Sequence, residues 1–185
     1  MRKWRILSSH YPVDTKFLRL RCDRVELPSG VVVENYFIRE SRGFCIIFAV
    51  TPNENVLLVR QYKHGIGEIV TELPAGMIDA DETPEACAVR ELIEETGYSG
   101  SPPELVRTFM ADPTNATTRF HLFVIHDAHP THDQAFDITE EIEVDLVSVD
   151  EARAMAMDGR IAAGSQVAAI LVALHHLGAE RQLGS

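Results

Sequence analysis

The sequence predicts a mixed α/β domain, with strands first, one helix in the middle, more strands, and helices last. Short apolar runs separated by turns that contain Pro, Gly or Asn fill the first part of the chain. One segment with helix start and stop signals follows at 84–96, and a long, mostly apolar helical segment lies at 161–177. Hydrophobic residues make up 45% of the 185 residues, which is enough for a sizeable core.

Two hairpins are predicted near the N-terminus. Segments 17–27 and 31–39 alternate imperfectly between apolar and polar residues and are joined by a Pro-Ser-Gly turn. Segments 44–50 and 56–61 are apolar runs on either side of a Pro-Asn-Glu-Asn turn. Both patterns are typical of antiparallel strands joined by a short connection.

A further strand and a helix are predicted next. Residues 69–73 have the composition of a strand, which Pro74 ends. Thr83 then offers an N-cap, Pro84 suits the first helical position, and Gly97 supplies a stop. The sequence therefore predicts a helix between Thr83 and Gly97.

Strands and helices are predicted for the remainder of the chain. The strands cover 104–110, 119–126 and 142–147, and the helices cover 150–157 and 161–177. The last helix is apolar around most of its surface, so we expect it to be largely buried.

Charge is concentrated in one segment. The formal net charge of −11 argues against a general nucleic-acid surface, which would be basic. Over half of this charge lies between Asp79 and Glu95, where seven carboxylates accompany a single cation, Arg90. Such a cluster is either solvated or neutralised by something brought in from outside.

The cysteines and the apolar stretches indicate the cellular compartment of the protein. Cys22, Cys45 and Cys87 are widely spaced and form no Cys-x-x-Cys pair, so we predict reduced packing residues. No apolar stretch is long enough to span a bilayer, and no signal core follows the basic N-terminus. We therefore expect a cytoplasmic protein with no membrane partner.

The helical segment 84–96 divides into two arcs when it is plotted at about 100° per residue. One arc is apolar and contains Ala86, Val89, Leu92 and Ile93, with Ala88 at its margin. The other contains Glu91, Glu94 and Glu95, with Arg90 at its edge. Carboxylates at this spacing repel each other by about a few tenths of a kcal/mol per pair. They therefore either face water or bind cations.

The acidic arc belongs to a longer pattern. It runs Gly76, five residues, Glu82, seven residues, and then Arg90-Glu91-Leu92-x-Glu94-Glu95-x-Gly97-Tyr98. At all nine specified positions this pattern resembles the Nudix box, the signature of the Nudix hydrolase superfamily. The resemblance implies a Nudix fold of the α/β class, in which a mixed β-sheet is sandwiched between helices. It divides the chain into an N-terminal antiparallel β extension at 1–40, expected to dimerise, and a Nudix hydrolase domain at 41–185.

The spacing of the glutamates suits a hard divalent cation, which takes oxygen ligands. Glu91 and Glu95 lie one turn apart and can converge on one cation, while Glu94 can reach a neighbouring one. The resemblance implies that these three residues are metal ligands, and that the backbone carbonyl of Ala75 is another. It implies Mg²⁺ as the cofactor, with Mn²⁺ as the alternative, and metal ions that bridge the diphosphate.

The same resemblance supplies the catalytic candidates. It implies that Arg90 orients the carboxylates, through an ion pair with Glu82, and it places Glu94 among the catalytic residues as well as the ligands. A base or additional ligand is expected on a loop beyond the box. Glu140 aligns best with that position, and Glu141 is the fallback.

Two flanking stretches, 56–63 and 72–79, resemble the ADP-ribose pyrophosphatase branch, which shares features with nucleoside diphosphate sugar hydrolases. Pro113 lies 15 residues after Tyr98, where that branch typically has a proline. The loop after this proline lacks the glycines common in the branch, which leaves the terminal sugar open. The candidate substrate-binding residues are Arg60, Glu72, Pro113 and Arg119.

We therefore expect hydrolysis of ADP-ribose to AMP and ribose 5-phosphate. One alternative is hydrolysis of another nucleoside diphosphate sugar, such as GDP-mannose, or of an oxidised nucleotide. A second is a module that senses ADP-ribose without cleaving it, although such regulators usually have a helix-turn-helix where 1–40 is predicted as strands. The expected partners are a small-molecule nucleoside diphosphate and, from the resemblance alone, a second copy in a homodimer.

Overall fold

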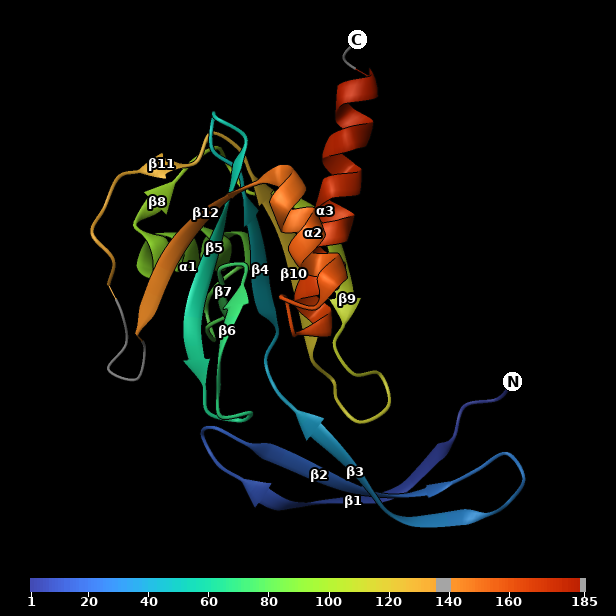
Figure 1. Cartoon of the computed structure of the whole chain (residues 1–185). Coiled ribbons are helices and arrows are strands. Elements are labelled where there is room, and N and C mark those ends of the chain that lie inside the picture. The colour runs from blue at the N-terminus through green and yellow to red at the C-terminus, as the bar shows by residue number, and fades with distance from the viewer. Residues whose placement is uncertain (136–140, 184–185) are drawn as a thin grey trace. The chain divides into compact units, whose positions relative to one another are not determined.

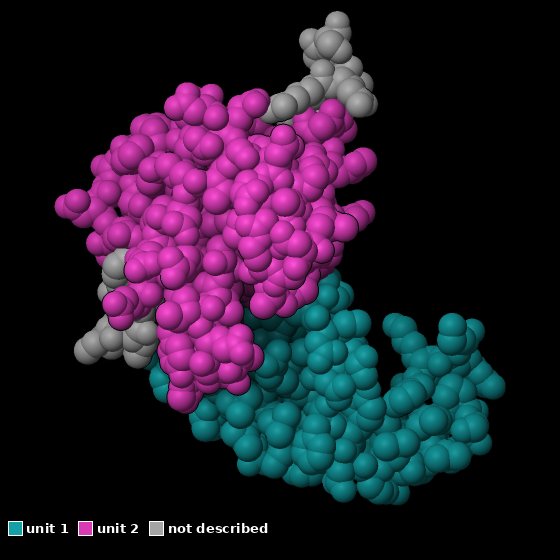
Figure 2. All heavy atoms as spheres, in the orientation of Figure 1, with its two compact units in different colours: residues 1–43, 110–119 teal, residues 44–109, 120–185 magenta. Residues whose placement is uncertain are grey.

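The computed structural model describes residues 1–135 and 141–183, and the chain divides into two compact units. The first unit contains 1–43 and 110–119, and the second contains the rest of the chain (Figure 2). In the described part of the chain, no helix is long and apolar enough to cross a membrane.

The first unit contains an antiparallel sheet of three strands. In spatial order these are β1 (Arg5–Asp14), β2 (Arg19–Glu26) and β3 (Val32–Glu40). Gly30 has a φ of 84° in the turn between β2 and β3, a left-handed conformation that glycine adopts without a steric penalty. Its N–H donates to the carbonyl of Leu27 at 2.9 Å. The first predicted hairpin is therefore confirmed, and β1 is a strand outside the predicted segments.

The second unit contains two larger sheets and a short strand pair. One sheet has the order β7 (Ala75–Met77), β4 (Phe44–Ala49), β10 (Arg119–Ile125) and β9 (Glu104–Met110). The other has the order β12 (Ile142–Ser148), β5 (Asn55–Lys63) and β6 (Glu68–Glu72), and β8 (Tyr98–Ser99) pairs with β11 (His129–Pro130). The first sheet is mixed, because β4 runs parallel to β10 and antiparallel to β7. Strands β6, β9, β10 and β12 correspond to predicted segments, whereas β7 was not predicted.

The second predicted hairpin, between 44–50 and 56–61, is wrong in its pairing. The turn itself is present, since the N–H of Thr51 donates to the carbonyl of Asn55 at 2.9 Å. Val50 pairs with Val56 in a single antiparallel bridge, and beyond this bridge β4 and β5 enter different sheets. Every residue from Val56 to Val59 is fully buried, so this stretch needs cover on both faces. Stacked layers provide that cover, and a two-stranded hairpin does not.

Helices lie on both sides of the first sheet in the second unit (Figure 1). They are α1 (Pro84–Thr96), α2 (Val149–Asp158) and α3 (Gly164–Leu183). Ile46 and Phe48 of β4 pack in a core cluster with α2 and α3, whereas Cys45 and Ile47 pack in a second cluster with α1. The predicted arrangement of a mixed sheet between helices is confirmed. Helix α3 begins three residues later and ends six residues later than the predicted 161–177.

Candidate active site

Helix α1 presents the acidic arc, and its ends are set by local signals. Thr83 has an extended backbone, and its Oγ1 accepts a hydrogen bond from the N–H of Ala86 at 3.2 Å. Pro84 occupies the first turn, where a missing N–H costs nothing. Gly97 ends the helix with a φ of 74°, and its N–H donates to the carbonyl of Ile93 at 2.8 Å. The predicted start and stop are both confirmed.

The buried face of α1 coincides only in part with its apolar arc. Ala86 and Val89 are exposed, whereas Glu95 is only 3% exposed. The buried positions are Cys87, Ala88, Leu92, Glu95 and Thr96. The helix therefore buries part of its acidic arc against protein, and part of its apolar arc faces solvent. A wheel drawn from hydrophobicity alone cannot show this burial, because it depends on what the helix packs against.

The partner on that side is strand β7. A Cβ atom added at Gly76 would lie 1.9 Å from both Cδ and Oε1 of Glu91. With any larger residue at position 76, the Glu91 carboxylate would have to leave this place. The side chain of Glu91 is 13% exposed, so it lies between helix and strand.

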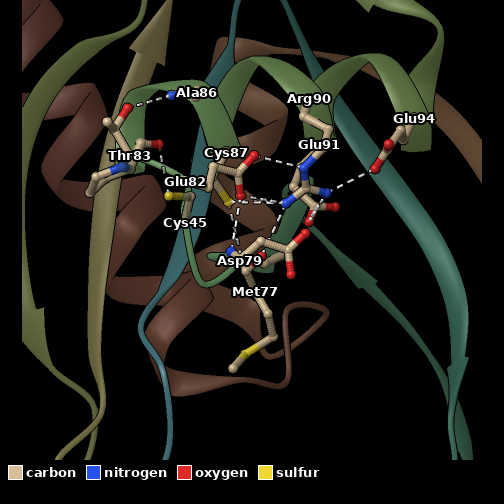
Figure 3. A network of polar contacts seen from close by, with 12 residues as sticks. Cys45, Met77, Asp79, Glu82, Thr83, Ala86, Cys87, Arg90, Glu91 and Glu94 are labelled. Carbon is tan, nitrogen blue, oxygen red and sulfur yellow. Dashed lines mark hydrogen bonds and ion pairs between the residues drawn. The ribbon is translucent and has the colours of Figure 1, made fainter.

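Arg90 joins three of the carboxylates (Figure 3). Its Nε and Nη2 each donate to Glu82, to Oε1 and Oε2 respectively, at 2.8 Å. Its Nη1 donates to Glu91 at 2.7 Å and to Glu94 at 2.9 Å. The planar fork of a guanidinium suits this geometry, whereas a lysine ammonium has no such fork. The expected ion pair between Arg90 and Glu82 is present, and the orienting role of Arg90 stays a prediction.

Arg90 also changes the proton affinity of its partner. The hydrogen bonds from the guanidinium lower the pKa of Glu82 from 4.5 to about 2, against the opposing effect of burial. A further bond from the Asp79 N–H to Glu82 acts in the same direction. The same contacts raise the pKa of Arg90 above its ordinary value, with the bond to Glu82 as the largest cause. Both groups are therefore charged at neutral pH.

Glu95 is held from two sides. Its Oε2 accepts a hydrogen bond of 2.9 Å from the N–H of Ala75, the first residue of β7. Its backbone carbonyl accepts a bond of 2.6 Å from Nε2 of Gln134. The carboxylate is thus fixed next to the strand whose Ala75 carbonyl is the fourth predicted ligand.

These groups fit a hard divalent cation in their chemistry. The donors are carboxylates and a backbone carbonyl, and the absence of a side chain at Gly76 lets the Glu91 carboxylate lie directly over the β7 backbone. Within 1–135 and 141–183, however, no three His, Cys, Asp or Glu side chains converge as a ligand set. Glu91 and Glu94 are instead paired with Arg90.

A cavity of about 220 Å³ lies beside β7 in the second unit, and its lining includes Lys63, Glu72, Ala75, Gly76, Ser165 and Gln166. Glu72 is 7% exposed, and its Oε1 accepts from Nε2 of Gln61 at 2.9 Å and pairs with Nζ of Lys63 at 2.7 Å. Glu72, a predicted substrate-binding residue, therefore lines the same cavity as Ala75.

The other predicted substrate-binding residues are not gathered there. Arg60 is 45% exposed and pairs with Glu143 of the neighbouring strand at 3.1 Å. Pro113 and Arg119 belong to the first unit, in segment 110–119. Their roles stay predictions.

The predicted loop base, Glu140, lies outside the described residues. Its fallback, Glu141, is exposed and directly precedes β12.

Two thiols lie under the box. Cys45 donates to the carbonyl of Pro84 at 3.1 Å, and Cys87 donates to the carbonyl of Gly76 at 3.6 Å. A hydrogen bond with Cys45, together with burial, raises the pKa of Cys87. Both are free and buried, as is Cys22, which confirms the prediction of reduced packing residues.

The sequence analysis did not single out Gln166. This residue is 4% exposed on α3 and forms hydrogen bonds with Leu73, close to β7. The available signal is its position as a lone amide in the otherwise apolar run that follows Ser165. A residue of that kind needs a buried partner, but the sequence does not say which.

Two family profiles match this chain. The Nudix domain profile matches residues 40–167, and that of the nucleoside diphosphate sugar hydrolase N-terminal domain matches 4–38. The chain is 31% identical over 157 residues to the methanol dehydrogenase activator of Bacillus methanolicus, with 84% of each protein covered. It is 29% identical over 138 residues to the ADP-ribose pyrophosphatase of Bacillus subtilis (strain 168), with 74% of each covered.

A solved structure described as an ADP compounds hydrolase has the same fold, with a TM-score of 0.87 and 97% of both chains covered at 18% identity. Nudix enzymes generally use divalent metal ions and act on small nucleoside diphosphate substrates. Because the Nudix profile covers most of the chain and includes the whole box, this protein belongs to the Nudix family and is a hydrolase of the ADP-ribose pyrophosphatase-like type.

Proposed function

We propose that the protein is a Mg²⁺-dependent pyrophosphatase that hydrolyses ADP-ribose to AMP and ribose 5-phosphate. The observation that supports this most directly is the packing of the glutamates of α1 against the side-chain-free backbone of Gly76, with Glu95 bonded to Ala75. The similarity to an ADP-ribose pyrophosphatase supports the choice of substrate. The reaction adds one water molecule across the P–O–P bridge.

In this proposal Glu91, Glu94, Glu95 and the carbonyl of Ala75 hold the metal. Bound Mg²⁺ would supply charge neutralisation of the diphosphate and acidify a water molecule. The protein's contribution is to hold its ligands in place before substrate arrives. Glu95 accepts a hydrogen bond from the β7 backbone, and Glu91 is enclosed above Gly76. Neither carboxylate therefore has to lose much conformational freedom when the metal binds.

Arg90 and Glu82 have a supporting part. The guanidinium reduces the repulsion between Glu91 and Glu94, and its bidentate bond to Glu82 fixes its own direction. Glu140 is proposed as the group that takes a proton from the attacking water or completes the metal site, by resemblance, with Glu141 as the alternative.

The substrate contacts proposed are Arg60, Glu72, Pro113 and Arg119. Glu72 has the strongest support among them, because it lines the cavity that includes Ala75 and Gly76. A buried carboxylate with one oxygen bonded to Gln61 and Lys63 can accept a hydrogen bond from a substrate hydroxyl at the other oxygen.

The central test is Glu95→Gln, assayed for Mg²⁺-dependent release of AMP from ADP-ribose. Loss of a ligand carboxylate should reduce kcat by roughly 100-fold or more. Glu85→Gln is the matched control, because Glu85 is an exposed glutamate in the first turn of the same helix. Full turnover by Glu95→Gln would exclude the metal role.

The substrate itself needs a separate panel. Initial rates on ADP-ribose, GDP-mannose and 8-oxo-dGTP would be compared by phosphate release after phosphatase coupling. We expect the highest kcat/KM on ADP-ribose. A preference for GDP-mannose would move the proposal to another nucleoside diphosphate sugar, which the match of residues 4–38 also allows.

A further inference from the structure

Gln166 makes two hydrogen bonds to the backbone of one residue, Leu73. Its Oε1 accepts from the N–H of Leu73 at 3.0 Å, and its Nε2 donates to the carbonyl of Leu73 at 3.3 Å. A side-chain amide offers a donor and an acceptor at this spacing without any change of protonation. The amide therefore occupies the place of a neighbouring strand in a β-ladder. Gln166 is itself anchored in the first turn of α3, where its N–H donates to the carbonyl of Ala163 at 3.0 Å.

Leu73 needs this partner because it lies between two sheets. The last residue of β6 that pairs with β5 is Glu72, opposite Val59, and the chain joins the other sheet at Ala75, opposite Ile46. Leu73 is fully buried in the gap between the two ladders. Its backbone groups would otherwise be buried without a hydrogen-bond partner.

The three residues from Leu73 to Ala75 are held by three different elements. Gln166 of α3 holds Leu73, the N–H of Ile47 in β4 donates to the carbonyl of Pro74 at 2.9 Å, and Glu95 of α1 accepts from Ala75. The proline ring restricts φ at the middle residue, so this segment has little freedom to absorb a shift. A displacement at Leu73 is therefore passed on to Ala75.

We propose that Gln166 is a positioning residue for the metal site. Through Leu73 it sets where the Ala75 carbonyl points and where the Ala75 N–H meets the Glu95 carboxylate. This inference depends on the proposed function, because it takes Ala75 and Glu95 as ligands. It assigns a role in the site to a helix that begins at Gly164, far beyond the end of the Nudix box at Tyr98.

The test is Gln166→Met, which keeps an unbranched side chain of similar length and removes both bonds. Mn²⁺ binding would be measured by electron paramagnetic resonance, without substrate, so that the readout does not depend on turnover. We expect the Kd for Mn²⁺ to rise by about tenfold, as for other residues that do not bind the metal but orient its ligands. Ile170→Val is the control, because Ile170 is fully buried on the same helix, in the same core cluster as Leu73, but its side chain cannot form a hydrogen bond to the Leu73 backbone.

A merely structural role predicts a different result. If Gln166 only stabilises the fold, both variants should lower the Tm and neither should change the Kd for Mn²⁺. Hydrogen exchange of the Ala75 amide adds a local readout, which should speed up in Gln166→Met and not in Ile170→Val. Should Gln166→Met fail to fold, Gln166→Glu keeps the bond from the Leu73 N–H and loses only the donated one, and about a threefold rise in Kd is expected.

A double-mutant cycle separates this inference from the proposed function. If Gln166 acts through Ala75 and Glu95, Gln166→Met should add little to the loss of Mn²⁺ affinity already caused by Glu95→Gln. A Kd within twofold of the Ile170→Val control would overturn the inference, provided that Glu95→Gln binds Mn²⁺ weakly. If Glu95→Gln itself bound Mn²⁺ normally, the proposed function would fail as well.

Discussion

The carboxylate of Glu91 lies so close to the backbone of Gly76 that a Cβ atom at position 76 would be 1.9 Å from Glu91 Cδ. The obstructing atoms belong to the far end of a flexible side chain, so they can swing away. Gly76→Ala should therefore cost stability only modestly, about 1–3 kcal/mol, while displacing a proposed metal ligand. We expect kcat/KM for ADP-ribose to fall by roughly 100-fold.

The measurement pairs urea unfolding with steady-state kinetics on Gly76→Ala. Gly65→Ala is the control, because a Cβ at Gly65 meets nothing within 4 Å. It should leave both quantities nearly unchanged. Parallel losses of activity and stability in Gly76→Ala, with unfolding at assay temperature, would contradict the expected separation.

The Arg90–Glu82 pair predicts a defined loss of stability in acid. The pKa of Glu82 is lowered to about 2 in the folded protein, against an ordinary value of 4.5. Well above pH 4.5 the group is ionised in both states and its contribution is complete. As the pH falls toward about 2, the unfolded state binds the proton first, so the free energy of unfolding decreases.

Urea unfolding of wild type and Glu82→Gln between pH 7 and pH 3 measures this effect. The difference in unfolding free energy should be constant above about pH 5 and shrink below pH 4.5. If the difference in unfolding free energy does not change with pH over this range, the Arg90–Glu82 ion pair is not the cause of the loss of stability in acid.

Cysteine chemistry gives a third prediction. All three cysteines are free and buried, and the pKa of Cys87 is raised by its hydrogen bond with Cys45 and by burial. Because the thiolate is the reactive form, we expect no rapid reaction with Ellman's reagent in the folded protein at pH 8. All three thiols should react in denaturant. Fast labelling of one thiol without unfolding would show that the core opens locally.

The sheet of the first unit predicts self-association. Several of its large apolar side chains are exposed, among them Ile6, Val32 and Phe37 at 56%, 37% and 45%. Exposed apolar groups gathered on one sheet are typical of an interaction surface. We expect sedimentation to give twice the chain mass of 20.6 kDa, and Phe37→Asp to shift it toward the monomer.

Met157→Asp is the control for this experiment. Met157 is 70% exposed on α2 of the second unit, so the substitution adds the same charge on an element that is not part of the sheet. It should leave the mass unchanged. Wild-type protein that sediments as a monomer at tens of micromolar would remove the prediction of a homodimer.

Local signals made the box and its helix predictable. Thr83, Pro84 and Gly97 act through neighbouring backbone atoms, so a sequence segment is enough to place the helix. The box spacing likewise specifies which glutamates share a face. The ion pair from Arg90 to Glu82 could be expected because the resemblance supplied it, and not because eight residues of spacing require it.

Features that depend on tertiary packing were not predictable in the same way. The turn after Val50 was recognised, but the separation of β4 and β5 into two sheets depends on layers supplied by distant segments. The burial of Glu95 and the exposure of Val89 depend on where β7 packs against α1. The partner of Gln166 is 93 residues away, and an isolated glutamine gives no indication of it.

That separation of 93 residues also affects the order in which the enzyme assembles. A nascent chain that ends after α1 already contains every proposed carboxylate ligand of the box, but not the amide that satisfies Leu73. Contacts between distant segments form late, because closing a long loop costs entropy. We therefore expect the proposed metal site to form only after α3 has packed against the rest of the second unit. A chain truncated before α3 should retain the proposed carboxylate ligands but lack the hydrogen bonds that hold Leu73.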